Sequence, residues 1–251
     1  MDELIYDKLY REEDWHWWFR GRRAVVRALL EQAGVPPSPR ILDAGCGTGR
    51  NMVELGEMGA TAGVDASAQA VEYCRRRGLE NVRQSSIESL PFEDSSFDLV
   101  LMADVLEHIS DDDGALRELR RVCSPGGVLL ITVPAYRWMW SQHDESHHHK
   151  RRYTRGELLE RVRSSGWSPE VSTYFNSVLL PPIGLVRLLA RRGGPRKKSD
   201  TALTPGPLNG VLEMPMRMEA ALIRRGVRLP AGVSIGAVCR ADPGHKTPGG
   251  Q

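Results

Sequence analysis

One short segment constrains the fold of this 251-residue chain more than any other. Residues 41–49 read Ile-Leu-Asp-Ala-Gly-Cys-Gly-Thr-Gly, an apolar strand that runs into an acidic residue and three alternate glycines, and residues 50–55 then have helical spacing. Glycine is needed where the backbone turns through positive φ or lies directly against a ligand. A dinucleotide-binding turn would read Gly-x-Gly-x-x-Gly, but its third glycine position here is Arg50. The segment therefore predicts a nucleotide-type pocket of another kind.

Further strand and helix segments follow at the spacing of βα units. Residues 63–65 end a second apolar strand at Asp65, where a carboxylate can accept hydrogen bonds from both ribose hydroxyls. Residues 97–109 read as a buried strand and a loop, and a helical pattern over 116–122 precedes a fifth strand at 128–134. Such alternation predicts an α/β fold with a parallel sheet and helices on both faces.

These segments together resemble the class I S-adenosylmethionine-dependent methyltransferases, of the type 11-like small-molecule family. Residues 43–49 resemble the first motif, acidic-x-Gly-x-Gly-x-Gly, and residues 85–92 resemble the segment Gly-Asp-Ala-Glu-x-Leu-Pro-Phe. Residues 97–109 resemble the fourth motif. The resemblance covers about residues 35–175 and implies a Rossmann-like, seven-stranded, mostly parallel, doubly wound sheet with an antiparallel last strand.

The resemblance implies S-adenosylmethionine as cofactor, in a crevice beyond the carboxyl ends of the strands. Asp65 would hold the ribose. Ser86 stands where the family usually has an Asp against the adenine amino group, and a hydroxyl can still accept that hydrogen bond. The residues expected to bind the cofactor lie on this edge of the sheet or on the helix predicted over it: Trp18, Arg22, Asp43, Gly45, Gly47, Asp65, Ala66, Ser86, Ile87, Ala103 and Asp104.

An aromatic cluster begins the helix expected before the sheet. Residues 15–19 contain four aromatic side chains, and the helix runs to about Gly34. One hypothesis makes residues 1–34 a helical lid, with Trp18 near the sulfonium, where a cation gains from an aromatic face, and Arg22 near the methionine carboxylate. The other places these rings in the packing of the sheet's flanking helices, a common role of Trp. Both remain open from the sequence.

A histidine-rich segment follows the fifth strand. Residues 138–154 resemble a Trp-Ser-x-His-Asp … His-x-Arg-Arg-Tyr stretch of one bacterial branch of the family. Histidine is a suitable base near neutral pH, and the loop at this strand end would face the acceptor. The expected catalytic residues are His143, Asp144 and His149, with His108 from the loop after the fourth strand. Those expected to contact the acceptor are Trp138, Trp140, Arg152 and Tyr153.

Structural alternatives exist for the same residues. Histidines 147–149 also fit a solvated loop, and His108 also fits a structural role beside Glu107. Thr154 and Glu157 have the spacing of a capping box and predict a helix over 155–165. No metal site is expected here, because consecutive histidines converge poorly on one ion and closed sites need three or four ligands.

The remaining segments complete the expected domain organisation. The methyltransferase core is assigned to residues 35–177 and 231–240, with closing strands near 171–175 and 233–239. Residues 178–230 form an insertion that we expect to be a helical cap, with helices near 181–192 and 208–225. Residues 241–251, rich in Pro and Gly, are expected to be disordered. The cap predicts packing on the sheet or a homodimer contact, and its Arg- and Lys-flanked apolar stretch leaves peripheral membrane contact as the alternative.

Composition narrows the class of partner and compartment. A formal net charge of +2 argues against a nucleic-acid-binding protein, which usually has a concentrated basic face. The four cysteines form no Cys-x-x-Cys pair, no signal peptide opens the chain and no apolar stretch is long enough for a membrane span, so a cytoplasmic location is expected, with membrane association left open.

The sequence thus predicts methyl transfer from S-adenosylmethionine to a small organic acceptor, by in-line displacement that depends chiefly on alignment. Basic residues 150–152 suit an anionic group on the acceptor, and the cap and aromatic residues suit an apolar body, so natural-product, isoprenoid and lipid-linked acceptors all fit. Two alternatives remain. One is a catalytically silent regulatory subunit that binds the same cofactor, and the other is an NAD-dependent oxidoreductase, which the glycine spacing disfavours.

Overall fold

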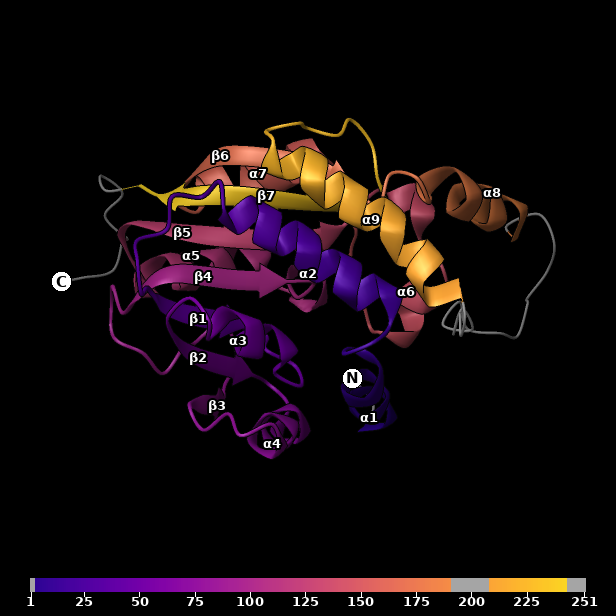
Figure 1. Cartoon of the computed structure of the whole chain (residues 1–251). Coiled ribbons are helices and arrows are strands. Elements are labelled where there is room, and N and C mark those ends of the chain that lie inside the picture. Colours follow the sequence, from indigo (N-terminus) through magenta and orange to yellow (C-terminus); the bar gives the residue numbers. More distant parts are fainter. Residues whose placement is uncertain (1–2, 191–207, 243–251) are drawn as a thin grey trace.

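A seven-stranded sheet forms the centre of the computed structural model, which describes residues 3–190 and 208–242. The strand order is β3-β2-β1-β4-β5-β7-β6 (Figure 1). The strands are β1 (Arg40–Ala44), β2 (Ala60–Asp65), β3 (Val82–Gln84), β4 (Phe97–Ala103), β5 (Cys123–Pro134), β6 (Trp167–Phe175) and β7 (Ser234–Ala241).

Strand direction follows the predicted arrangement. Strands β1 to β5 pair in parallel, whereas β7 is antiparallel to both β5 and β6. The carboxyl ends of β1, β2 and β4 therefore meet at one edge, where ligands of such sheets bind. This confirms the predicted Rossmann-like sheet with its antiparallel last strand.

Helices cover both faces of the sheet because successive strand residues point to opposite sides. On one face, Leu42, Val100 and Leu129 pack with α5 (Asp112–Val122) and α7 (Arg155–Ser164). On the other, Ile41 and Leu101 pack with α2 (Trp17–Leu30) and α9 (Asn209–Arg224). The remaining helices are α1 (Glu3–Glu12), α3 (Arg50–Leu55), α4 (Ala68–Arg76), α6 (Gln142–Ser146) and α8 (Leu180–Ala190).

Helices α2 (Trp17–Leu30) and α9 (Asn209–Arg224) lie side by side across that second face (Figure 1). The Trp17 amide donates to Asn209 Oδ1 over 2.7 Å at one end, and Arg224 pairs with Glu31 at the other. A Cβ at Gly21 would lie 2.6 Å from the Met216 sulfur, so glycine permits the close approach. Much of α2 and the inserted α9 therefore form part of the packed layer.

The first helix, α1, lies within the predicted helical segment 1–34, but we expected only the one helix that follows the aromatic cluster there. The α1 residues Tyr6, Leu9 and Tyr10 recur at intervals of three and one, which places them on one helical face. This face packs on α4, where the Tyr10 and Tyr73 ring centroids are 4.8 Å apart. The helix lies beside the glycine loop, and the consequences are described below.

The structure also adjusts several predicted boundaries. Helix α7 has the predicted capping box: the Glu157 amide donates to Thr154 Oγ1 over 3.3 Å and the Thr154 amide to the Glu157 carboxylate over 2.8 Å. Strand β7 includes Ala241, so the expected disordered tail was wrong at its first residue, because Ala241 pairs with Trp167 of β6.

Two expected features fall outside the described residues: the basic run at 191–198 and the rest of the tail from 243. Within the described part of the chain, no helix has both the length and the apolar character to cross a membrane.

Candidate active site

Glycine conformation shapes the loop between β1 and α3. Gly45 has φ +81°, and a Cβ there would lie 2.4 Å from a Val105 methyl group. Gly49, at φ +87°, precedes the first residue of α3, and a Cβ there would lie 2.5 Å from Leu79. Both positions require glycine because the backbone conformation and the packing each exclude a side chain.

Asp43 is a buried carboxylate with no partner. It is the next-to-last residue of β1 and is 1% exposed, and neither of its carboxylate oxygens has a hydrogen-bond partner among the described residues. Burial raises the pKa of Asp43 to about 7, against a lowering by Arg22 and with further raising by Asp65. A buried polar group without a partner is costly, so this carboxylate is suited to a cationic ligand group.

Asp65 ends β2 and already accepts three hydrogen bonds. The Gly47 amide donates to it over 3.0 Å, the Ser67 amide over 2.9 Å, and the Tyr6 hydroxyl over 3.3 Å. Burial raises the pKa of Asp65, while the two amide bonds lower it. Tyr6 belongs to α1, so this helix occupies the side of the crevice where the sequence predicts the ribose.

A buried ion pair fastens the end of α1 to the glycine loop. The Glu13 carboxylate accepts from the Thr48 hydroxyl and, over 2.6 Å, from the Arg77 guanidinium. Glu13 is 6% exposed, and burial raises its pKa despite these two partners. Tyr6 and Glu13 are not among the predicted site residues, although the aromatic spacing of residues 6–10 is a signal for the helix that carries Tyr6.

Arg22 reaches the same edge from α2. Its guanidinium pairs with the Asp104 carboxylate over 2.7 Å, and the other Asp104 oxygen accepts from the Thr132 hydroxyl over 3.1 Å. Asp104 follows β4 with φ +57°, and Ala103 before it is buried. The structure thus brings Arg22, Asp43, Asp65 and Asp104 to one end of the sheet, while the predicted contact of Arg22 with the methionine carboxylate stays a prediction.

The remaining cofactor candidates are more dispersed. Ser86 is exposed, and its hydroxyl donates to the Glu88 carboxylate over 2.9 Å, whereas Ile87 is buried. Ala66 is exposed directly after β2. The Trp18 ring is half-buried and stacks on Phe175 with centroids 6.3 Å apart.

The histidine-rich loop and the loop after β4 meet at the same end of the sheet. The Lys150 amide donates to the Glu107 carbonyl over 2.7 Å and joins the two loops. The ring centroids of His108 and His149 are 4.6 Å apart, and those of His143 and His147 are 4.0 Å apart. Burial lowers the pKa of His108 to about 4 and that of His143 to about 3, so both are neutral at neutral pH.

Asp144 holds this loop from inside. It is fully buried and accepts from His149 Nδ1 over 2.9 Å and from Arg152 Nε over 2.7 Å. Burial alone would raise the pKa of Asp144, but these two hydrogen bonds hold it well below its usual range. When Nδ1 carries the proton, the lone pair of His149 lies on Nε2. Asp144 is itself buried, so it can act only through the residues that it positions.

The structure does not bring all the predicted acceptor residues to a surface. Arg152 is buried against Asp144 and the Ala135 carbonyl, and the buried Tyr153 hydroxyl donates to Asp112 over 2.9 Å. Trp138 is 40% exposed and stacks on Tyr136, and Trp140 is half-buried. Of the four, only the two tryptophans have surface that an acceptor could touch.

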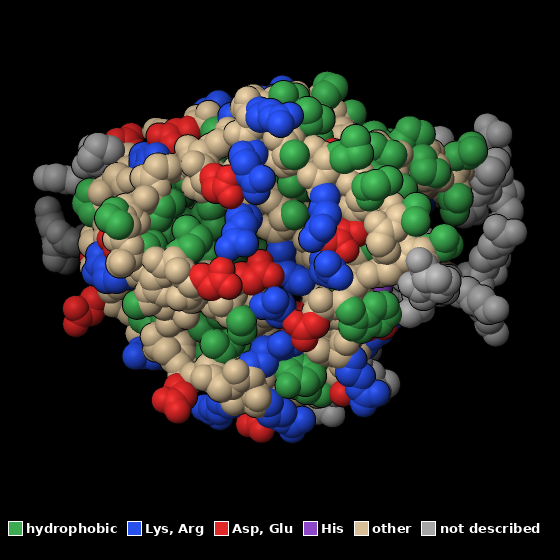
Figure 2. All heavy atoms as spheres, in the orientation of Figure 1, with side chains coloured by type: hydrophobic (Ala, Val, Ile, Leu, Met, Phe, Trp, Pro, Cys, Tyr) green, Lys and Arg blue, Asp and Glu red, His purple; other side chains and the backbone are tan. Residues whose placement is uncertain are grey.

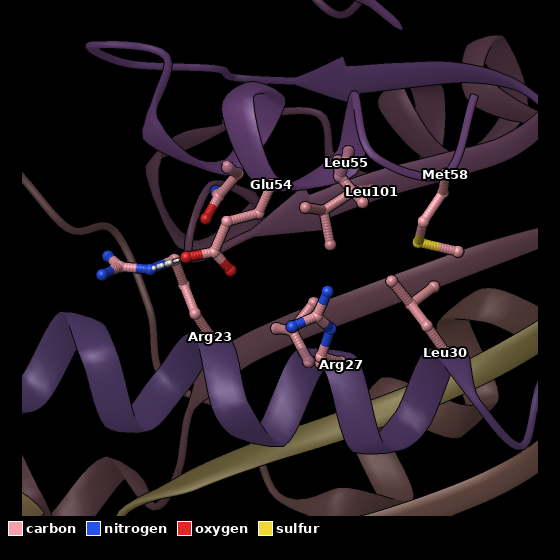
Figure 3. A pocket seen from close by; sticks show the side chains of 9 residues that line it. Arg23, Arg27, Leu30, Glu54, Leu55, Met58 and Leu101 are labelled. Atoms are coloured by element: carbon pink, nitrogen blue, oxygen red, sulfur yellow. Dashed lines mark hydrogen bonds and ion pairs between the residues drawn. The ribbon is translucent and has the colours of Figure 1, made fainter. Parts of the chain in front are cut away.

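A separate hollow lies between α2 and α3, beside the ion pair of Arg23 and Glu54 (Figure 3). Its walls include Leu30, Met58 and Leu101, and its volume is about 20 Å³. It opens over a face of the sheet and is far too small for an adenosine, so it is not the cofactor site.

Comparison with known proteins decides the family. The family described as a methyltransferase domain matches residues 42–131, which include the glycine loop, Asp65 and Asp104. Residues 42–131 therefore carry a methyltransferase domain similar to those of the class I S-adenosylmethionine-dependent methyltransferases. S-Adenosylmethionine is the methyl donor of this family, as predicted.

Similar methyltransferases include a probable S-adenosylmethionine-dependent methyltransferase of Mycolicibacterium smegmatis, 28% identical over 71% of this chain and 68% of the relative. A ubiquinone/menaquinone biosynthesis C-methyltransferase of Shewanella sediminis is 33% identical over 43% of this chain and 48% of the relative. Across the first curated relatives, the match spans 35% to 68% of the relative's own length.

The fold is similar to that of solved methyltransferases. A structure of a methyltransferase bound to the Haloferax volcanii activator Trm112 superposes with a TM-score of 0.63 and 19% identity, over 98% of this chain and 96% of that one. At this identity, the likeness supports the fold and not the partner.

Proposed function

We propose that this methyltransferase transfers a methyl group from S-adenosylmethionine to a small organic acceptor. The observation that carries the proposal is the unpartnered carboxylate of Asp43, buried at the carboxyl end of β1 on the same edge as Asp65. A bound donor supplies an electrophilic methyl group on a cationic sulfonium and also carries an ammonium group. Those charges fit a crevice edge that has three carboxylates, of Asp43, Asp65 and Asp104, and one guanidinium, of Arg22.

Each side chain has a distinct binding role in this proposal. Asp43 pairs with the donor's ammonium group and thereby gains the partner that it lacks. Asp65 accepts the ribose hydroxyls in place of the Tyr6 hydroxyl, while it keeps the amides of Gly47 and Ser67. Helix α1 then covers the bound donor and excludes water from the site.

The acceptor would lie on the side of the histidine cluster. A histidine imidazole can take a proton from a hydroxyl or amine, and this cluster includes His143, His147 and His149. The relatives named for ubiquinone and menaquinone support an apolar acceptor, as do the exposed aromatic surfaces of Trp138 and Trp140.

Calorimetric titration with S-adenosylhomocysteine tests the binding half of the proposal. Asp65→Asn should weaken binding about 10-fold or more, since a hydrogen bond to a charged group contributes about 1.5–3 kcal/mol. Asp94→Asn is the matched control, because Asp94 is exposed and pairs with Arg121 away from the crevice. Heat evolved with NAD, or equal affinity in the Asp65→Asn variant, would contradict the proposal.

Methyl transfer itself separates an enzyme from a silent regulatory subunit. A metabolite extract incubated with isotopically labelled donor should contain a labelled product by mass spectrometry. His149→Gln should reduce its yield while S-adenosylhomocysteine binding is retained, and His148→Asn, a change of the adjacent exposed histidine, should not. Donor binding without any labelled product would favour the regulatory subunit.

A further inference from the structure

Three potential metal ligands converge next to the proposed acceptor site. Glu107 and His108 lie in a 3-10 turn (Leu106–His108) after β4, and His149 follows α6. One donor atom from each of these side chains lies within 4.8 Å of the other two. We propose that Glu107, His108 and His149 bind a first-row divalent cation, for which Zn²⁺ is the best match.

The donor set favours zinc over the alkaline-earth ions. Two imidazole nitrogens and one carboxylate oxygen match the ligands of catalytic zinc sites, whereas Mg²⁺ and Ca²⁺ prefer oxygen ligands alone. Donors on a tetrahedral ion with bonds of about 2.1 Å lie about 3.4 Å apart. Modest side-chain rotations would therefore close the observed cluster on an ion.

Asp144 gives His149 the orientation of a metal ligand. The hydrogen bond of 2.9 Å from Nδ1 to the buried Asp144 fixes the ring and leaves Nε2 for the ion. A carboxylate that accepts from the second ring nitrogen is the usual support of a ligating histidine. The backbone bond between Lys150 and Glu107 in turn fixes the two loops to each other.

Glu107 is the strongest indication of a cation site. It is 1% exposed, and its Oε2 atom has no hydrogen-bond partner within the described ranges. The nearby guanidinium groups do not neutralise Glu107. Arg152 is paired with Asp144, and Arg22 is paired with Asp104.

The sequence predicted no metal site in the histidine-rich segment, because consecutive histidines converge poorly on one ion. This reason does not apply to the cluster, because its ligands come from the loops after two different strands. Of the histidines at 147–149, only His149 is a ligand.

The ion also implies a class of acceptor, in a step that rests on the proposed function. Zinc with three protein ligands keeps an open position, and an oxygen bound there loses its proton more easily. An acceptor hydroxyl or phenol would bind the ion through this oxygen. Its O–H bond breaks, the electron pair stays on oxygen, and the proton passes to solvent water.

Equilibrium dialysis against Zn²⁺ tests the site directly. The untagged full-length chain should be used, freed of metal by a chelator, because a polyhistidine tag binds the same ions. We expect one Zn²⁺ per chain by elemental analysis, and at least 10-fold weaker binding in each of Glu107→Gln, His108→Gln and His149→Gln. Asp144→Asn should weaken binding about 10- to 100-fold through His149. His148→Asn, the adjacent histidine, should bind as the native chain does.

Co²⁺ substitution gives a readout that needs no variant. A three-ligand site of low coordination should produce strong visible absorption, which Zn²⁺ abolishes by displacement. Absence of bound Zn²⁺ in the native chain, or unchanged affinity in Glu107→Gln and His108→Gln, would overturn the site. Titration with S-adenosylhomocysteine in the same preparations separates the two proposals: a chain that binds this ligand but no zinc refutes only the metal site, and the reverse refutes only the donor site.

Discussion

Individual residues at the crevice balance stability against binding. Asp43 is buried without a hydrogen-bond partner in the part of the chain that the structure describes, and Asp65 is partnered by a tyrosine that a bound donor would have to displace. Both arrangements lower the stability of the protein without ligand. Such compromises are typical of functional sites.

Removal of the Asp43 charge should stabilise the free protein. Its pKa rises from 3.8 to about 7 on folding, so the folded state favours the protonated form. Its contribution to stability is therefore greatest below pH 4 and declines as the pH rises through 7. Asp43→Asn should raise the free energy of unfolding at pH 8 by about 2–4 kcal/mol and change it little at pH 4. Urea denaturation at both pH values measures this, and calorimetry should show weaker donor binding by the variant. Equal stability of the two proteins at pH 8 would contradict the account of Asp43.

Loss of the Tyr6 hydroxyl should strengthen donor binding. In the free protein this hydroxyl donates to Asp65, and the donor's ribose would have to replace it. Tyr6→Phe removes the competing bond, worth about 0.5–1 kcal/mol, and should raise the affinity for S-adenosylhomocysteine about 2- to 5-fold. Tyr10→Phe, on the same helix, should leave the affinity unchanged. An affinity that falls in Tyr6→Phe would mean that the hydroxyl assists binding.

Among the secondary-structure elements, the α2 and α9 pair depends on one glycine. A Cβ at position 21 would approach the Met216 sulfur to 2.6 Å and the Met216 Cβ to 2.8 Å. Gly21→Ala should lower the free energy of unfolding by about 1–3 kcal/mol, the usual cost of overpacking. Gly156→Ala on α7 meets no atom within 4 Å and should be neutral or slightly stabilising. Equal stability of the two variants would show that α9 does not pack on α2 as described.

The outer surface of α8 and α9 is apolar. Figure 2 shows hydrophobic side chains gathered over these helices, and the exposed ones are Val178, Leu185, Val186, Leu208, Val211, Met214, Met218 and Leu222. Membrane contact therefore remains a prediction for the cap. Vesicles of anionic lipid in low salt should carry the protein upward in a flotation assay, and Met214→Glu with Met218→Glu should reduce the floated fraction several-fold. Val53→Glu, at an exposed position on α3, is the control. A native chain that stays with the unfloated material would reject the prediction.

Sequence patterns predicted the elements whose signal is local. Such local signals are the glycine loop and the acidic residues that follow apolar strands. Another is the capping box, in which Thr154 and Glu157 are only three residues apart. Within the predicted helical segment 1–34, α1 was not recognised as a separate helix, because its pattern is short and directly precedes the stronger aromatic cluster.

Long-range partners explain the rest of the difference. Arg152 and Tyr153 read as surface residues because nothing in the sequence identifies Asp144 and Asp112 as their buried partners. The meeting of Glu107 and His149 likewise depends on how the loops after β4 and β5 fold together. Paired buried charges of this kind follow from tertiary structure and not from composition.

In the whole molecule, the candidate residues meet at one edge of the sheet. The carboxyl ends of β1, β2 and β4 lie at this edge (Figure 1) and bring the donor residues together. Helix α1 contacts the edge through the Tyr6 to Asp65 hydrogen bond, and the loops after β4 and β5 add the histidine cluster. The order of the strands, rather than any single motif, therefore builds the site.

A crystal structure of the chain with S-adenosylhomocysteine is the most direct measurement of this account. We predict the ligand at that edge, its ribose hydroxyls on Asp65 with the Tyr6 hydroxyl displaced, and its ammonium group beside Asp43. A ligand bound elsewhere, or one that leaves the Tyr6 to Asp65 hydrogen bond intact, would contradict it.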